Sequence, residues 1–229
     1  MQRRTAIVLP GLDGTGNLLE DFCAGAPPEI DCRAIRYPTD EPLGYDALER
    51  YVLEQLPTDR PLIVIGESFS GPIAVRLAAR LSQVTALVLC NSFITPPRSP
   101  LLRFGAHAPL FRVRLPERIL AALMLAPLAT PALTSALATT LRRVEPSVLA
   151  YRIRELLRVD ETPALKRVRV PITYLRGTRD RLVPDRALHV ITATAPAVRV
   201  VRIEAPHAIL QTAPRESWTA IESVFDLPT

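Results

Sequence analysis

The stretch Gly66-Glu67-Ser68-Phe69-Ser70-Gly71 joins an apolar run at 61–65 to a helical pattern over 71–81. A serine in a sharp strand-to-helix turn, with small residues two positions before and after it, is the layout of a nucleophile elbow. Large side chains at positions 66 and 70 would collide, because strand and helix backbones approach closely at such a turn. Ser70 takes the place of the usual second glycine. The alternative is an ordinary turn between a strand and a helix that carries a serine.

The composition indicates a globular chain with a substantial core. It has 229 residues, of which 48% are hydrophobic, enough for one α/β domain with an insertion. The net charge is +5, and Lys166 is the only lysine among 28 basic residues. The arginines are scattered among acidic residues and aromatic residues make up 5%, a pattern that argues against a nucleic-acid partner.

Cysteine usage and the amino-terminal residues predict a cytoplasmic location. Cys23, Cys32 and Cys90 lack metal-ligand spacing and are interpreted as small core residues in a reducing compartment. The apolar run at 6–9 is too short for the hydrophobic region of a signal peptide.

An uncharged stretch over 119–141 is long enough to cross a bilayer. It contains Pro127 and Pro131 and is rich in alanine and threonine, so its hydrophobicity is weak. A span here would also separate Ser68 from the acid and histidine candidates that follow it. We therefore expect no membrane span.

Apolar, β-branched runs alternate with helical patterns along the chain. The predicted strands are 5–9, 32–37, 62–65, 86–91, 172–176 and 198–203. The predicted helices are 45–55, 71–81, 185–194 and 214–225. This order predicts a mostly parallel sheet of about six strands with helices on both faces. Between the fourth and fifth strands only helical patterns occur, so we expect a core of 1–92 and 171–229 with a helical cap inserted at 93–170.

The glycine-rich loop Pro10-Gly11-Leu12-Asp13-Gly14-Thr15-Gly16 follows the first predicted strand. It lacks the spacing of a dinucleotide fingerprint and the Gly-Lys-Ser/Thr of a phosphate-binding loop. Glycines also allow a loop to approach a nucleophile closely enough to supply an oxyanion hole. We assign that role to the N–H groups of Leu12 and Phe69.

Two further candidates follow the last two predicted strands. Asp180 comes after the strand at 172–176, and His207 comes after the strand at 198–203. A capping role is the alternative for Asp180, and its rival Asp185 fits better as a charge at a helix start. The other histidines are less well placed, because His107 lies in the insertion and His189 in a predicted helix.

Serine, acid and histidine thus occur in this order, each after a different strand of one parallel sheet. In this the whole chain resembles the α/β-hydrolase superfamily, which includes serine esterases, lipases and thioesterases. The resemblance implies an α/β-hydrolase fold, a catalytic triad of Ser68, Asp180 and His207, and no metal or cofactor.

The chain departs from the family pattern in two ways. The antiparallel strands that many members carry before the oxyanion loop are missing, and Pro10-Gly11 replaces a common His-Gly. Some members keep their acid after the strand that follows the nucleophile helix. Here that strand ends in Cys90-Asn91-Ser92, without a carboxylate, which favours Asp180.

The apolar insertion resembles a cap over an acyl pocket, which predicts a carboxylic ester hydrolase acting on a small-molecule ester with an apolar acyl or alkyl group. One alternative is a thioesterase or acyltransferase for carrier-bound acyl groups. In that case an acidic acyl-carrier protein would be met by cap arginines, namely Arg98, Arg103, Arg112, Arg114 and Arg118. A non-catalytic binding member of the fold is the alternative of another class.

Overall fold

The computed structural model describes residues 4–97 and 116–223. Within them, one sheet of six strands has the order β2-β1-β3-β4-β5-β6, and every neighbouring pair is parallel. The strands are β1 Arg4–Leu9, β2 Ile30–Ala34, β3 Leu62–Glu67, β4 Val84–Cys90, β5 Ile172–Gly177 and β6 Arg199–Ile203. The predicted α/β-hydrolase fold is confirmed.

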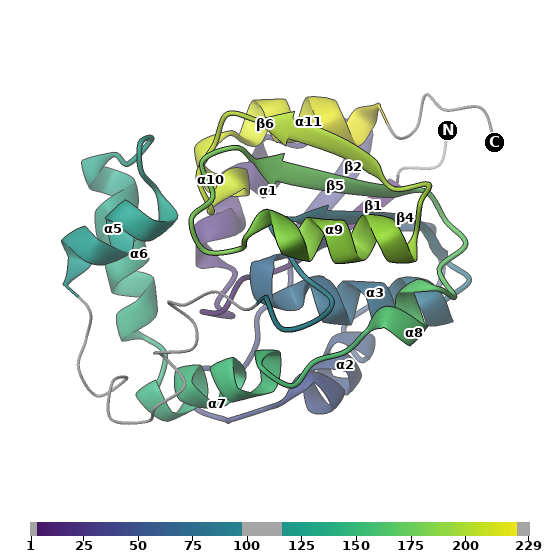
Figure 1. Cartoon of the computed structure of the whole chain (residues 1–229), viewed down its shortest axis with the longest axis horizontal. Helices are drawn as coiled ribbons and strands as arrows, with labels where there is room; N and C mark the ends of the chain where they lie inside the picture. Colours follow the sequence, from purple (N-terminus) through teal and green to yellow (C-terminus); the bar gives the residue numbers. More distant parts are fainter. Residues whose placement is uncertain (1–3, 98–115, 224–229) are drawn as a thin grey trace.

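Helices cover both faces of the sheet (Figure 1). On one face lie α2 Tyr45–Leu53, α3 Gly71–Arg80, α8 Thr162–Leu165 and α9 Asp185–Thr194. On the other lie α1 Glu20–Ala24, α10 Ile209–Thr212 and α11 Pro214–Glu222. Successive side chains of the buried strands alternate between the two cores, since side chains of a strand point to opposite faces in turn. In β3, for example, Val64 belongs to the first core and Ile65 to the second.

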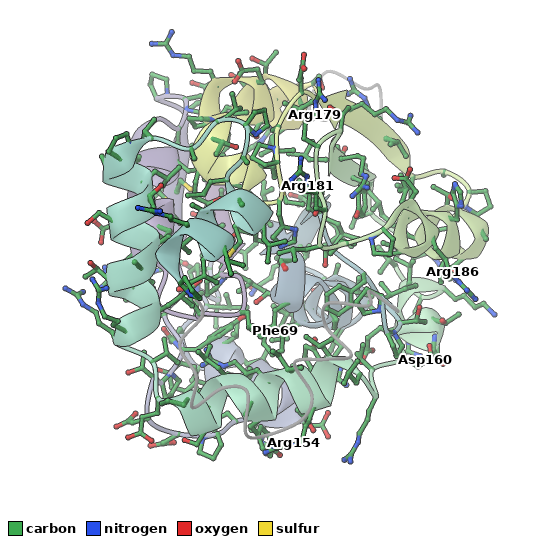
Figure 2. All side chains as sticks on the ribbon, turned by 60° about the vertical axis from the view of Figure 1, so that its left-hand side comes forward. Phe69, Arg154, Asp160, Arg179, Arg181 and Arg186 are labelled. Atoms are coloured by element: carbon green, nitrogen blue, oxygen red, sulfur yellow. The ribbon has the colours of Figure 1, made fainter. Side chains whose placement is uncertain are left out.

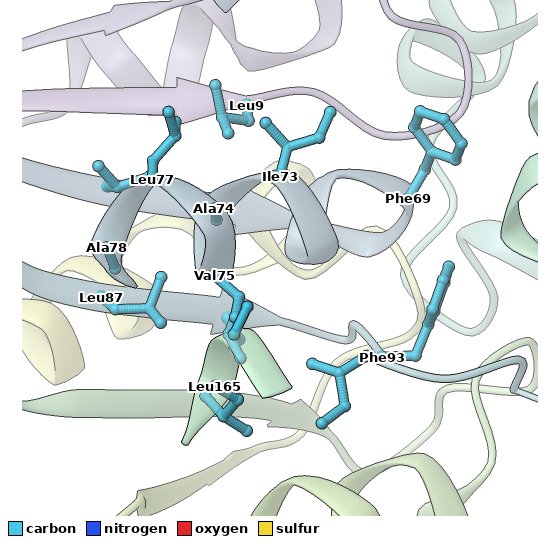
Figure 3. Packing of buried hydrophobic residues seen from close by; sticks show 14 of the residues in the cluster. Leu9, Phe69, Ile73, Ala74, Val75, Leu77, Ala78, Leu87, Phe93 and Leu165 are labelled. Atoms are coloured by element: carbon cyan, nitrogen blue, oxygen red, sulfur yellow. The ribbon is translucent and has the colours of Figure 1, made fainter. Parts of the chain in front are cut away.

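Helix α3 packs directly on the centre of the sheet. Figure 3 shows its Ile73 and Leu77 beside Leu9 of β1, while Val75 lies on the side of Leu165. Of these five side chains, Leu165 is 1% exposed and the other four are fully buried. This packing fixes the position from which the turn after β3 leaves the sheet.

The predicted strand at 32–37 differs from β2, which begins at Ile30 and ends at Ala34. Beyond Ala34 the chain leaves the sheet, because the N–H of Tyr37 donates to the carbonyl of Gly14 at 2.7 Å. Ile35 and Tyr37 remain buried, which accounts for their strand-like apolar pattern.

Between β4 and β5 the described residues form α5 Glu117–Met124, α6 Pro131–Arg142, α7 Pro146–Leu156 and α8. The uncharged stretch at 119–141 is divided between α5 and α6 by a break that contains Pro127. The Oγ1 of Thr130 accepts the N–H of Leu133 at 3.1 Å and so caps α6 at its start. No described helix has both the length and the apolar character needed to cross a membrane.

Candidate active site

Ser68 lies in the turn between β3 and α3 with a φ of 48°, in the left-handed region that non-glycine residues seldom adopt. The turn is tight on both sides. A Cβ at position 66 would lie 2.7 Å from the Cβ of Ala74, and one at Gly71 would collide with the Oγ of Ser92. Ser92 in turn donates its hydroxyl hydrogen to the carbonyl of Ser68 at 2.6 Å. The local geometry is therefore that of an elbow which lifts one serine away from the sheet.

The three residues predicted from their order lie together at the carboxyl edge of the sheet. The Oγ of Ser68 is 2.9 Å from Nε2 of His207, and Nδ1 of His207 is 3.0 Å from Oδ1 of Asp180. With a neutral imidazole, Nδ1–H donates to the carboxylate and Nε2 accepts the serine hydroxyl. This hydrogen-bonded chain can draw a proton from Ser68.

Asp180 is held by an arginine side chain and by backbone N–H groups as well as by His207. Its Oδ1 accepts the N–H groups of Leu182 and Val183 at 2.8 and 3.2 Å, and its Oδ2 accepts from Arg176 at 3.1 Å. Burial alone would raise the pKa of Asp180, but His207 and these N–H donors outweigh it and the pKa is lowered. The rival Asp185 also pairs with Arg176, at 2.8 Å, but its side chain is 69% exposed.

His207 is buried, and two carboxyl groups of different character act on its pKa. Burial alone would lower its pKa, but the charge and hydrogen bond of Asp180 outweigh this effect, and the pKa lies above its ordinary value. Glu67 also raises the pKa of His207. Burial raises the pKa of Glu67 itself to about 7, although its hydrogen bonds with Gln211 and the Gly11 backbone oppose this. Burial thus brings the pKa of Glu67 close to neutrality.

Asn91 joins the end of β5, which leads to Asp180, to the loop after β6, which contains His207. The sequence patterns did not predict this role. Asn91 Nδ2 donates to the carbonyls of Pro206 and His207 at 3.0 and 2.9 Å, and its Oδ1 accepts the N–H of Gly177 at 2.8 Å. The side chain is fully buried, and Asn91 has a φ of 43°. The signal in the sequence is its place directly after β4, at the carboxyl edge of the sheet.

The loop after β1, which contains the predicted oxyanion donor Leu12, is tied to the elbow through Ser70. Its hydroxyl donates to the carbonyl of Pro10 and therefore accepts from the hydroxyl of Tyr37, 2.7 Å away. Glycine at this place could make neither contact. Phe69, the residue before Ser70, is held by Tyr45. The Tyr45 hydroxyl donates to the carbonyl of Phe69 at 3.1 Å, and the two rings stack with centroids 4.8 Å apart.

Ser68, His207, Leu12 and Phe69 line one cavity of about 750 Å³. Most of the rest of its wall is apolar and comes from the segment between β4 and β5, while Leu18, Val183 and Ala208 are among the lining residues that the core supplies. Examples from α5, α6 and α7 are Leu120, Met124, Leu137, Ala138, Leu149 and Ile153. Figure 2 shows Phe69 in the space that these helices border. Asp180 lies behind His207, with no exposed side-chain surface.

The other candidates lie elsewhere. His189 is exposed on α9, and Arg118 is exposed on α5. His107, Arg98, Arg103, Arg112 and Arg114 lie outside the described residues.

Cys23 and Cys32 contact each other with sulfur atoms 3.2 Å apart. Among the residues that the structure describes, no group of three or more His, Cys, Asp or Glu side chains could hold a metal ion.

A family model described as "Alpha/beta hydrolase family" matches residues 2–218. The chain belongs to this family. A 109-residue segment is 32% identical to the AMB antimetabolite synthetase AmbE of Pseudomonas aeruginosa, covering 43% of this chain but 5% of that protein. The chain thus corresponds to a small part of that relative.

Solved structures of the family have the same fold. The enol-lactonase of Burkholderia xenovorans superposes with a TM-score of 0.80 at 15% identity, covering 99% of this chain and 93% of that one. The bromoperoxidase of Bacillus anthracis superposes with a TM-score of 0.82 at 16% identity, with the same coverages of 99% and 93%. At these identities the likeness shows the fold alone.

We predict that Asn91→Ala lowers the kcat of the hydrolase by about 10²-fold, because a small misplacement of His207 suffices for a loss of that size. KM should change little, since Asn91 does not line the cavity. Stopped-flow or steady-state kinetics would measure both constants, with near-ultraviolet circular dichroism to verify folding. A folded variant with the wild-type kcat would contradict the positioning role.

We also predict that Glu67→Gln moves the acidic limb of the kcat/KM profile to lower pH. An imidazole can act as a base only when it is neutral, so a raised pKa of His207 would make activity fall at a higher pH on acidification. Removing the Glu67 charge removes one cause of the raised pKa. The matched control is Glu204→Gln, since the Glu204 side chain is 76% exposed and pairs with Arg179. An unmoved or upward-shifted limb in Glu67→Gln argues against the interaction.

Proposed function

We propose that this chain is a serine hydrolase that cleaves carboxylic esters with an apolar acyl or alkyl group. The observation that carries the proposal is the chain of contacts from Ser68 through His207 to buried Asp180, opening into a largely apolar cavity. Membership of the alpha/beta hydrolase family supports hydrolase chemistry in general terms.

The reaction proceeds in two halves. In the first, His207 takes the Ser68 proton while Oγ attacks the acyl carbon, and the negative charge that forms on the carbonyl oxygen is received by the N–H groups of Leu12 and Phe69. The tetrahedral intermediate collapses, His207 gives its proton to the leaving oxygen, and the alcohol departs. The acyl-enzyme remains on Ser68.

In the second half, His207 takes a proton from water, and the oxygen of that water attacks the acyl-enzyme. Collapse of the second tetrahedral intermediate releases the carboxylic acid and returns the proton to Ser68. Asp180 keeps the imidazole in the required tautomer and stabilises the imidazolium in both halves.

The predicted cap at 93–170 supplies the acyl site in this proposal. Leu137 and Ala138 of α6 and Ile153 of α7 give the cavity an aliphatic wall suited to a hydrocarbon chain. A thioester, or transfer to an acceptor other than water, would use the same triad and differ only in the group that leaves or enters. An acyl-carrier partner belongs to that alternative.

The first test is covalent labelling. A fluorophosphonate should modify the wild type at Ser68 and leave Ser68→Ala unlabelled, because only an activated serine displaces the fluoride at a useful rate. Intact-mass and peptide mass spectrometry would locate the adduct. Labelling that persists in Ser68→Ala, or a wild type that hydrolyses none of a panel of p-nitrophenyl esters and acyl thioesters, would refute the proposal.

The second test concerns the cavity. Ala138→Trp should lower kcat/KM for a p-nitrophenyl decanoate by about tenfold or more relative to the acetate, because added volume excludes the long chain. Ala136→Trp on the same helix is the matched control, since Ala136 is exposed. Equal losses on both esters in a folded Ala138→Trp variant would show that α6 does not border the acyl chain.

A further inference from the structure

Arg152 of α7 is the most unusual buried side chain near the site. It is fully buried, yet among the described residues its guanidinium contacts three backbone carbonyls and no carboxylate. Nη1 donates to Leu12 and Asp13 at 2.9 and 2.8 Å, and Nη2 donates to Pro38 at 2.8 Å. Nε is buried without a hydrogen-bond partner among those residues. Burying such a charge is costly, so its position requires an explanation.

Two of these carbonyls belong to the turn that carries the assigned oxyanion donor. The carbonyl of Gly11 accepts the N–H of Gly14 at 3.1 Å, which closes a four-residue turn with Leu12 and Asp13 at its centre. Because a trans peptide is planar, the N–H of Leu12 points opposite to the Gly11 carbonyl. Any rotation of the turn would therefore re-aim that N–H.

Arg152 holds the central peptides of this turn from the side of the predicted cap. Without its guanidinium, the carbonyls of Leu12 and Asp13 would lose their donor and turn toward water. The fit is close, since a Cβ at Gly14, where φ is 74°, would collide with Nη1. The Arg152 guanidinium also lies 5.6 Å from the ring centre of Tyr37, whose hydroxyl contacts Ser70 of the elbow.

The same helix borders the acyl cavity. Leu149, Ile153 and Leu156 of α7 line the cavity, at spacings that place them on one side of the helix. Arg152 extends from α7 to the turn, so a single element contacts both the space for the acyl chain and the oxyanion donor.

We propose that Arg152 is a positioning residue that sets the turn of Gly11–Gly14 and thereby aims the Leu12 N–H at the oxyanion. The proposal rests on the serine hydrolase function proposed above. The buried positive charge of Arg152 lies close to this turn and adds to the electrostatic stabilisation of the oxyanion.

The experiment compares Arg152→Met and Arg152→Lys with Arg154→Met. Arg154 is the matched control because residues two apart on a helix point in nearly opposite directions, and Figure 2 shows it on the far side of α7 from Phe69. We measure kcat and KM on one p-nitrophenyl ester. We also measure the inhibition constants of an alkyl boronic acid, which forms a tetrahedral adduct with serine, and of the product carboxylate.

Arg152→Met should lower kcat by about 10²-fold with KM nearly unchanged, as expected for a misaimed donor. The affinity for the boronic acid should fall in parallel, while that for the carboxylate should fall less, because only the tetrahedral adduct is bonded to Ser68 and holds its oxygen where the oxyanion of the transition state forms. Arg152→Lys keeps the charge but not the planar fork, so its kcat should lie between those of the wild type and Arg152→Met. Arg154→Met should match the wild type.

A folded Arg152→Met variant with wild-type kcat would overturn the inference, as would equal losses of boronic acid and carboxylate affinity. If Arg152→Met does not fold, Arg152→Lys is the deciding variant. A folded Arg152→Lys variant with wild-type kcat and wild-type boronic acid affinity would overturn the inference, because the planar guanidinium would then not be needed to position the turn. These outcomes are distinct from failure of the proposed function, in which the wild type itself would neither hydrolyse esters nor react at Ser68.

Discussion

The close approach of β3 and α3 at Gly66 is the constraint on which the rest of the site depends. No side chain fits there, since even a Cβ would lie 2.7 Å from that of Ala74. The chain must therefore reverse within the few residues after β3, and Ser68 takes a left-handed conformation that costs on the order of 1–3 kcal/mol. The buried packing of α3 on the sheet and the stacking of Phe69 on Tyr45 offset that strain.

The parallel sheet brings the remaining groups to the elbow. Asp180 and His207 follow adjacent strands, β5 and β6, whereas Ser68 follows β3, two strands away from β5. The intervening strand, β4, ends at Cys90, and the next residue, Asn91, binds backbone atoms at Gly177, Pro206 and His207. A neutral amide suits this place because it offers a donor to two carbonyls and an acceptor to one N–H. A carboxylate would offer acceptors alone.

Much of this arrangement could be predicted from local sequence. The elbow has small residues at fixed positions, and the acid and histidine each follow an apolar run, so position along the chain indicates position at the sheet edge. The end of β2 could not be predicted, because the chain leaves the sheet after Ala34 to contact Gly14. Asn91 and Arg152 could not be assigned either. Arg152 is 140 positions from Leu12 in sequence, and only the packed fold shows that they touch.

The buried charges around the cavity are accommodated in three different ways. Asp180 keeps its negative charge through Arg176, His207 and backbone N–H groups, whereas Arg152 directs its charge at carbonyl dipoles. Glu67 has a pKa of about 7 because burial penalises its charged form. Each arrangement keeps a polar group oriented by the protein rather than by water. When an apolar chain fills the cavity and displaces solvent, these groups need not reorganise, and their interactions strengthen as the local dielectric constant falls. The apolar wall and the fixed charges therefore act together, because exclusion of water by the first increases the effect of the second.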